Sequence, residues 1–398
     1  MPLIRATIGK IFIDGKAENE MKILFAIPTL TYSGAPKMMA WVANQMAAKG
    51  HEVHFVAFFS SEQARMLHEN VEMRSLNVTR SKSRLARNTT KMAQALWRLH
   101  RTVKKVKPDV VVTFLDSVGY MYLPIARFLT KCKTVASERV DPYTYRGKIA
   151  KIRFFLMGFA DGFVFQTDGA RKFFKERKKI YDVGVVIPNP VVIGEKARAL
   201  RSSVPAFEER DDRIVTVGRL SLKQKRQDVL LEAFKLLRET RPQLKLEMCG
   251  DGADKAKIQE LIDQAGLSDC ATLAGRVDDV EGAIVNARAF ALSSDFEGIP
   301  NALIEALSVG VPSVATDCSP GGAALLIKDG ENGFIVPRGD AKALAEKLAI
   351  LVDDKETSER FSANGPAIES DFAEAAIADR WEDYFNSLIN GRRENGER

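Results

Sequence analysis

Short apolar runs alternate with segments of helical periodicity along the first half of the chain. Apolar runs at residues 22–27, 53–59 and 109–114 predict buried strands. Between the first two, apolar residues recur at helical spacing over residues 38–49, and Gly50 supplies a helix end. Strand, helix and strand in this order predict a βαβ unit with parallel strands. Further strands are expected at residues 133–136 and 163–167.

The same alternation restarts after a polar stretch at residues 194–212 that has the composition of a linker. Apolar runs at residues 213–217, 244–249, 271–274 and 289–292 predict the strands of a second α/β unit. A chain of 398 residues also exceeds the usual size of a single core. The predicted division is an N-terminal extension (1–20), a first domain (21–195), a linker (196–212), a second domain (213–374), a terminal helix (375–390) and a disordered tail (391–398).

Composition narrows the class of protein. The apolar fraction of 45% and the charged fraction of 28% are ordinary for a soluble globular protein. The N-terminus lacks the apolar block of a signal peptide, and no apolar run is long enough to span a bilayer. The four cysteines are scattered without metal-site spacing, which indicates a reducing compartment. We therefore expect a cytoplasmic protein without a bound metal.

The net charge of +7 hides a difference between the two halves. Residues 1–200 carry 34 basic and 16 acidic residues, or +18, and the remainder carries 25 and 36, or −11. Residues 80–107 contain ten basic and no acidic residues, interleaved with apolar ones. A basic helix with an apolar face can lie on an anionic membrane surface. Equally, the apolar side can pack on the domain while the charges stay solvated.

Residues 293–305 carry the strongest indication of chemistry. A strand ends in small polar residues, a loop carries Glu297, and Pro300 opens a segment of helical spacing. The free N–H groups and dipole of a helix start favour an anion such as phosphate. Glu305 would lie about 7.5 Å into the helix, within reach of sugar hydroxyls. Two carboxylates around an anion site suggest a sugar diphosphate, although such pairs also occur on solvated surfaces.

A second cluster follows the strand at residues 213–217. Gly218 permits close backbone approach, and Arg219 and Lys225 supply two cations at a strand-to-helix junction. Cations held there would stabilise the negative charge that develops on a departing diphosphate. The alternative is a solvated group, because Lys223 and Arg226 lie close by in the sequence.

These segments resemble the family-4 (group 1) retaining glycosyltransferases. The resemblance rests on Glu-Gly-Ile-Pro-Asn-Ala-Leu-Ile-Glu from Glu297, on the sequence that follows to Thr316, and on Gly-Arg-Leu with a lysine six positions after the arginine. It implies the GT-B fold, with two facing Rossmann-like domains and a C-terminal helix that crosses back to the first. The first domain would bind the acceptor and the second the nucleotide sugar.

The resemblance also implies an activity. A hexosyl unit would pass from a nucleotide diphosphate sugar, UDP-linked in our prediction, to an acceptor hydroxyl with retention, without cofactor or metal. The expected catalytic residues are Arg219, Lys225 and Glu297. The expected donor-binding residues are Gly34, Ala35, Gly218, Gly250, Arg276, Val277, Gly298, Ile299, Pro300, Asn301 and Glu305.

The acceptor side departs from the family pattern. Many members place a histidine after the strand at residues 133–136, where this chain has Glu138 and Arg139. The candidate acceptor contacts are Asp116, Glu138, Arg139 and Asp141, which follow strand ends. The missing histidine keeps open a catalytically silent partner subunit as an alternative.

The basic first half suggests the partner. A lipid-linked or polysaccharide acceptor at the inner face of the membrane would account for its charge and apolar stripes, so we expect cell-surface polysaccharide or glycolipid assembly. A nucleic-acid-binding protein is the remaining alternative. Trp97 is the one aromatic residue of the basic run, which offers no stacking platform, so no nucleic-acid partner is expected.

Overall fold

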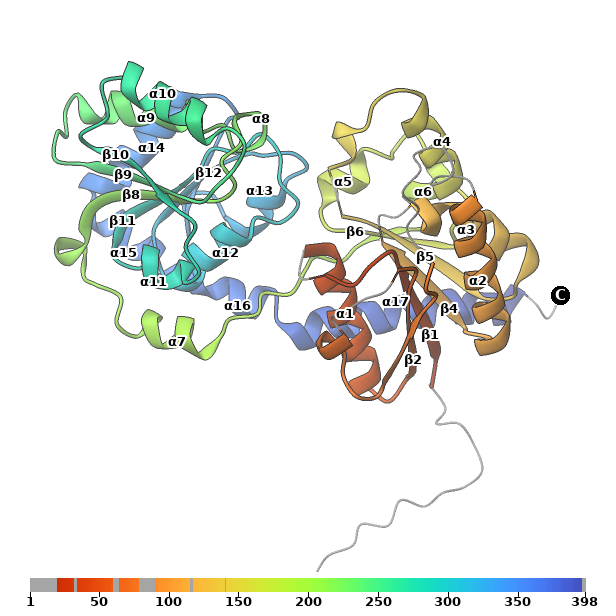
Figure 1. Ribbon diagram of the computed structural model, residues 1–398. Helices are drawn as coiled ribbons and strands as arrows, with labels where there is room; N and C mark the ends of the chain where they lie inside the picture. Colours follow the sequence, from red (N-terminus) through yellow and green to blue (C-terminus); the bar gives the residue numbers. More distant parts are fainter. Residues whose placement is uncertain are drawn as a thin grey trace, which may run out of the picture. The chain divides into compact units, whose positions relative to one another are not determined.

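The computed structural model describes residues 20–31, 34–59, 64–78, 90–114, 117–139 and 141–395. Asp116 and nearly all of the N-terminal extension lie outside these residues. The chain divides into two compact units, residues 1–134 with 389–398, and residues 135–388. Figure 1 gives the labels of the elements.

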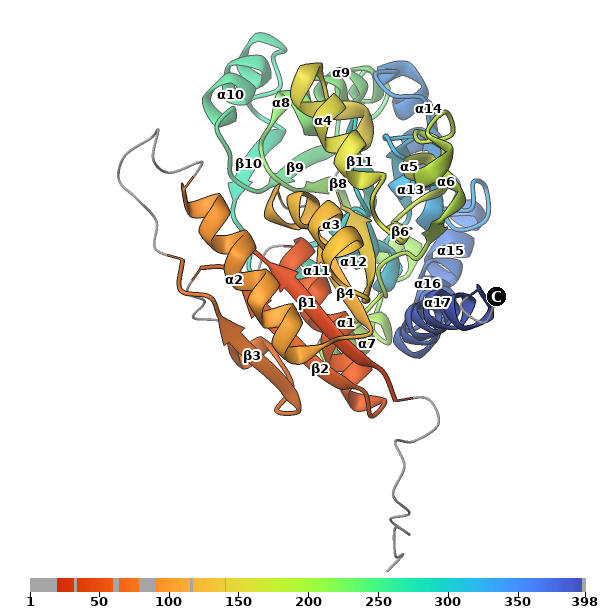
Figure 2. The same cartoon turned by 90° about the vertical axis from the view of Figure 1, so that its right-hand side faces the viewer.

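Four parallel strands and their helices build the first unit. Its strands are β1 (Lys22–Ile27), β2 (Glu52–Ala57), β3 (Val71–Ser75) and β4 (Val110–Phe114), and its helices are α1 (Gly34–Ala48), the 3-10 helix η1 (Ala64–Met66), α2 (Thr90–Val106) and α3 (Ser117–Leu129). Figure 2 shows α2 and α3 on one face of these strands and α1 on the other.

The basic helix α2 uses its apolar side to build the core of this unit. Ala95, Leu99 and Val103 follow one another at helical spacing and are all buried, in one cluster with residues of the strands and of α3. The basic residues Arg101, Lys104 and Lys105 are exposed, whereas Arg98 is half-buried and donates to the Leu76 carbonyl. Of the two alternatives for the described part of the basic run, the structure therefore favours packing on the domain.

The parallel strands within the described residues fall into two sheets, so the predicted α/β class is confirmed. One sheet has the order β3-β2-β1-β4-β5-β6-β7 and the other β10-β9-β8-β11-β12-β13. The strands of the second unit are β5 (Lys133–Glu138), β6 (Gly162–Phe165), β7 (Gly184–Val186), β8 (Asp211–Val217), β9 (Lys245–Cys249), β10 (Ala271–Gly275), β11 (Ala287–Leu292), β12 (Ser313–Thr316) and β13 (Phe334–Val336).

Helices cover both sheets of the second unit. They are η2 (Pro142–Thr144), α4 (Gly147–Met157), α5 (Asp168–Lys172), α6 (Lys178–Asp182), α7 (Glu195–Arg201), η3 (Phe207–Glu209), α8 (Leu222–Lys225), α9 (Gln227–Arg238), α10 (Lys255–Gln264), α11 (Val280–Ile284), α12 (Asn301–Ser308), α13 (Gly322–Leu326), α14 (Ala341–Asp353), α15 (Lys355–Asn364), η4 (Gly365–Ala367), α16 (Ile368–Asp371) and α17 (Glu374–Asn395).

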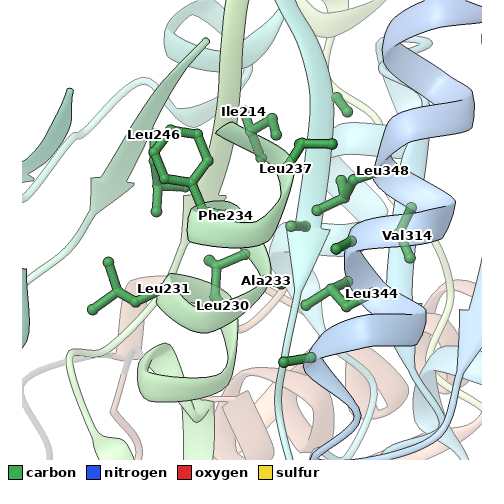
Figure 3. Close-up of a cluster of buried hydrophobic side chains, with 14 of the residues drawn as sticks. Ile214, Leu230, Leu231, Ala233, Phe234, Leu237, Leu246, Val314, Leu344 and Leu348 are labelled. Carbon is green, nitrogen blue, oxygen red and sulfur yellow. The ribbon is translucent and has the colours of Figure 1, made fainter. Parts of the chain in front are cut away.

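The second sheet owes its rigidity to a fully buried apolar layer. Figure 3 shows Phe234 of α9 and Leu344 of α14 among the side chains that meet over the strands. Ile214 of β8 and Val314 of β12 supply the facing surface, and all four are fully buried. Each such side chain contributes about 1.5–3 kcal/mol through burial. This layer fixes the strand ends from which the candidate site is built.

The terminal helix α17 returns to strands of the first sheet. The Tyr384 hydroxyl accepts a hydrogen bond from the Phe163 N–H at 2.8 Å and donates to the Val183 carbonyl at 2.5 Å. Trp381 and Phe385, on the same helix, are fully buried. The expected C-terminal helix is therefore present. It extends past residue 390, and a further helix, α7, lies in the stretch that reads as a linker.

Candidate functional site

Loops from neighbouring strands converge at the carboxyl edge of the second sheet. Because these strands are parallel, their carboxyl ends share one edge. Glycines let the loops touch: a Cβ at Gly250 would lie 1.8 Å from the Gly218 carbonyl oxygen, and one at Gly322 would lie 1.7 Å from that of Gly298. The predicted donor residues Gly218, Gly250 and Gly298 therefore all belong to this convergence.

Lys225 and Glu297 meet at this edge. The Lys225 ammonium lies 2.6 Å from Glu297 Oε1, and both side chains are mostly buried. Ser294 Oγ donates a 2.8 Å hydrogen bond to the same carboxylate oxygen. A Cβ at Gly218 would come within 3.1 Å of the Lys225 ammonium, so this glycine leaves the room in which the lysine lies. The structure thus brings together three residues that the sequence analysis placed in one site.

The loop that carries Glu297 is fastened to α8, a connection that the sequence analysis did not identify. The Asp295 N–H donates to the Gln224 carbonyl at 2.8 Å, and the Gln224 amide donates to the Phe296 carbonyl at 3.2 Å. Ser293 Oγ donates to the Lys225 carbonyl at 2.7 Å. Small polar residues at a strand end are the only signal in the sequence that could have indicated these bonds.

Arg226 makes a second cross-connection that sequence reasoning missed. Its backbone is left-handed, with φ of 47°, and its guanidinium bonds Asp228 and Asp295 at 3.0–3.2 Å. The hydrogen bonds that Arg226 donates to these carboxylates raise its pKa above the usual range. This arginine acts as a clamp between α9 and the Glu297 loop, whereas Arg219 and Lys223 point to solvent.

The helix that follows the loop begins one residue later than Pro300. Pro300 is the N-cap of α12 and is buried, and Asn301 opens the helix with an exposed side chain. Ile299 and Glu305 are half-buried. The eight residues of α12 place Glu305 a little more than one turn from the helix start.

The remaining predicted donor residues are divided between the two compact units. Arg276 follows β10 and is exposed, and Val277 is half-buried against the core of the second sheet. Gly34 is the first residue of α1, and Ala35 is half-buried there. These two belong to the first compact unit.

The candidate acceptor residues of the second unit are bound into its framework. Glu138 is fully buried and pairs with Arg153 at 3.2 Å, and the Tyr145 hydroxyl donates to it at 3.2 Å. Asp141 caps η2 by accepting a 2.9 Å hydrogen bond from the Tyr143 N–H.

Arg139 is buried beside Glu138. Its guanidinium donates to Asn189 Oδ1 at 2.8 Å and lies over the Trp381 ring at 5.7 Å. Burial lowers the pKa of Arg139 to about 9, and the charge of Glu138 opposes this shift. Its backbone carbonyl lies near the place that a Cβ on Gly298 would take, at 3.7 Å.

A cavity of about 680 Å³ lies beside the Glu297 loop. One wall is the turn after β12, at residues 317–321, and this turn holds the loop because the Ser319 carbonyl accepts from the Glu297 N–H at 2.8 Å. The opposite wall includes Tyr143, Asp168 and Lys172. The Thr167 hydroxyl joins the two walls by donating a 2.7 Å hydrogen bond to the Pro320 carbonyl. None of the predicted donor residues lines this cavity.

Two family models match the chain. The model described as "Glycosyl transferases group 1" matches residues 199–367, and that of "Glycosyltransferase Family 4" matches residues 32–194. Among curated relatives, an alpha-1,4-N-acetyl-D-galactosaminyltransferase of Campylobacter jejuni that acts on a diNAcBac-PP-undecaprenol-linked glycan is 25% identical over 91% of this chain and 97% of its own. An amylovoran biosynthesis glycosyltransferase of Erwinia amylovora is 25% identical over 73% of this chain and 81% of its own.

Solved structures share the fold. A lipopolysaccharide outer core galactosyltransferase matches with a TM-score of 0.74 at 20% identity, over 94% of this chain and all of its own. Anabaena HepE, solved in complex with UDP and glucose, matches with a TM-score of 0.71 at 19% identity, over 92% of this chain and all of its own. The predicted GT-B fold is thereby confirmed. With both halves matched in order, the chain belongs to the group 1, family-4 glycosyltransferases.

Proposed function

We propose that this chain transfers a hexosyl unit from a UDP-linked sugar to an acceptor hydroxyl with retention of configuration. The observation that carries the proposal is the contact between Lys225 and Glu297 at the convergent loop edge. The Lys225 ammonium lies 2.6 Å from the Glu297 carboxylate and next to Gly218, which has no side chain to block it. In this position the ammonium can exchange the carboxylate for a diphosphate. The solved complex of Anabaena HepE with UDP and glucose supports this choice of donor.

In this proposal the site residues stabilise the charge of the departing diphosphate, and none of them acts as a nucleophile. The bond between the anomeric carbon and the diphosphate oxygen breaks, and its electron pair stays on that oxygen. Lys225 stabilises the resulting charge, and Arg219, which is exposed at the end of β8, would turn towards the bound diphosphate as the second cation. Each such hydrogen-bond donor lowers a barrier by roughly 3–4 kcal/mol. The acceptor oxygen bonds the anomeric carbon from the same face, and its proton passes to the departing phosphate. Glu297 orients Lys225 and accepts from sugar hydroxyls, and no metal is needed.

The acceptor is proposed to be a lipid-linked or polysaccharide glycan in cell-surface assembly, reached from the cytoplasmic side of the membrane. Support comes from the relatives in Campylobacter jejuni and Erwinia amylovora, whose names include an undecaprenol-linked glycan and amylovoran. No helix within the described ranges has both the length and the apolar character to cross a bilayer. An enzyme that works on such an acceptor would bind the surface of the membrane.

The test combines donor binding with turnover. Purified chain is mixed with UDP-glucose, UDP-galactose and UDP-N-acetylhexosamines, and the melting temperature and UDP release are followed with and without EDTA. We expect one donor to raise the melting temperature and to be slowly hydrolysed, with no effect of EDTA. Binding without hydrolysis or transfer would favour a silent partner subunit. An absence of any donor shift would contradict the proposal.

A further inference from the structure

Helix α4 is apolar on two opposite sides, and only one of them is used by the fold. Ala150, Phe154 and Met157 face inward and are buried. On the other side Ile149, Ile152 and Phe155 are exposed by 82%, 60% and 68%. These are three of the largest apolar exposures in the described part of the chain. Phe155 contacts the Phe159 ring at 5.3 Å, and the row is otherwise open to solvent. An exposed apolar row of this kind marks a binding surface.

The charges around this row are of one sign. Lys148 lies within the exposed row and Lys151 at its flank, and both are exposed. Residues 146–160 contain four basic and no acidic residues. We call Lys148, Ile149, Lys151, Ile152 and Phe155 the α4 face. The inward-facing Arg153 does not belong to it, because Arg153 is paired with Glu138.

Neighbouring segments enlarge the positive field. Arg177, just before α6, lies over the Phe154 ring of α4 at 4.5 Å. Helices α5 and α6 and the segment between them add four exposed lysines against one exposed glutamate, Glu176; the lysines are Lys172, Lys175, Lys178 and Lys179. A large apolar row within a basic field complements one surface above all, the headgroups and acyl boundary of an anionic bilayer.

We propose that the α4 face is the site at which this protein docks on an anionic lipid bilayer. The apolar row enters the acyl boundary, and the lysines bind the phosphate headgroups. A second copy of the chain is a poorer occupant, because a two-fold contact would set Lys148 and Lys151 against the same lysines of the partner. Helix α2 differs in this respect, because its apolar side is buried in the core and is not available to bind a membrane.

The position of α4 also relates it to the candidate site. Phe154 of α4 contacts Phe173 at a ring distance of 5.6 Å, and Phe173 contacts Tyr143 at 4.8 Å. Tyr143 lines the 680 Å³ cavity. Docking through α4 would therefore place that cavity next to the bilayer, where a lipid-linked acceptor resides. This last step rests on the proposed function, whereas docking itself does not.

The test is co-flotation with vesicles of phosphatidylglycerol and phosphatidylcholine, compared with pure phosphatidylcholine. We expect the full chain to bind only the anionic vesicles, and more weakly as salt rises. The double variant K148Q with K151Q should lose affinity by about 30-fold, at roughly five-fold for each lysine near the surface. The triple variant I149S, I152S and F155S should lose at least about ten-fold.

A matched control comes from α9, which also exposes a lysine beside a large apolar residue. The variant K235Q with L236S should bind vesicles as the unchanged chain does.

A further variant, F155W, reports insertion directly. Its tryptophan fluorescence should shift to the blue and be quenched by brominated lipid only with anionic vesicles. Unchanged melting temperatures and UDP-sugar binding would show that the variants fold.

Three results would overturn the docking site. They are full vesicle binding by the triple variant, loss of binding in the α9 control alone, and a dimer in solution that the triple variant dissociates while no vesicles bind. Donor hydrolysis without vesicles is measured in parallel. A docking failure with intact hydrolysis leaves the proposed transferase activity standing, and a loss of hydrolysis with intact docking contradicts only that activity.

Discussion

Lys225 and Glu297 are separated by more than seventy residues in the chain, yet the lysine ammonium lies 2.6 Å from the glutamate carboxylate. The two residues are held close together because residues 293–296, which precede Glu297, are hydrogen-bonded to α8, which ends at Lys225. In the proposed function, this preformed arrangement lets Lys225 bind a diphosphate at small cost in reorganisation.

We expect the variant K225Q to lower kcat by about 10²–10³-fold, because it removes a charge that acts on the departing diphosphate. The substitution keeps a hydrogen-bond donor on a side chain that is one atom shorter. Steady-state assay of UDP release measures the effect. K223Q is the matched control, since Lys223 lies two residues away and is exposed. Equal activity of the two variants would remove Lys225 from the mechanism.

We expect G250A to destabilise the protein by roughly 2–4 kcal/mol, because its Cβ would meet the Gly218 carbonyl and its φ of +147° disfavours a side chain. Urea unfolding measures the change. G391A is the control, since nothing lies within 4 Å of an added Cβ there and alanine favours a helix. A G250A protein as stable as the original would contradict the close approach of the two loops.

Much of this edge follows from local sequence pattern. Apolar runs located the strands, and the junction after one of them indicated Gly218, Arg219 and Lys225 as a group. The resemblance of the sequence motifs to a family placed that group in one site with Glu297. Spacing alone could not supply the partners across the fold. The Arg226 clamp depends on the approach of Asp295, and the burial of Glu138 depends on Arg153 from the next helix.

The amphipathic helices illustrate the same limit. Both α2 and α4 combine basic and apolar residues at helical spacing, and both could bind a membrane as far as sequence shows. Only packing distinguishes them, because the α2 stripe is buried by strands and α3 while half of the apolar surface of α4 remains exposed. Periodicity identifies an apolar face, and tertiary contacts decide what covers it.

Thiol reactivity should separate one cysteine from the other three. Cys249, Cys270 and Cys318 are buried, and burial raises the pKa of Cys249 and of Cys318 to about 12, whereas Cys132 is half-buried. The thiolate is the reactive form, and at pH 8 Cys249 and Cys318 are almost entirely protonated, so they should react slowly. A disulfide reagent should label at most one thiol in the folded protein and four in denaturant, and C132S should abolish the fast phase.

We expect Y384F to lower the free energy of unfolding by about 0.5–1.5 kcal/mol, because it removes the hydroxyl bonds to the Phe163 N–H and the Val183 carbonyl, which keep their own 3.1 Å bond to each other. The ring and its packing are unchanged, so the loss isolates the hydrogen bonds that fasten α17 to β6. Urea unfolding with far-ultraviolet dichroism measures it. Y143F is the matched control, since the Tyr143 side chain is half exposed and its ring contact with Phe173 survives the change. A Y384F protein as stable as Y143F would show that α17 is held by its apolar residues alone.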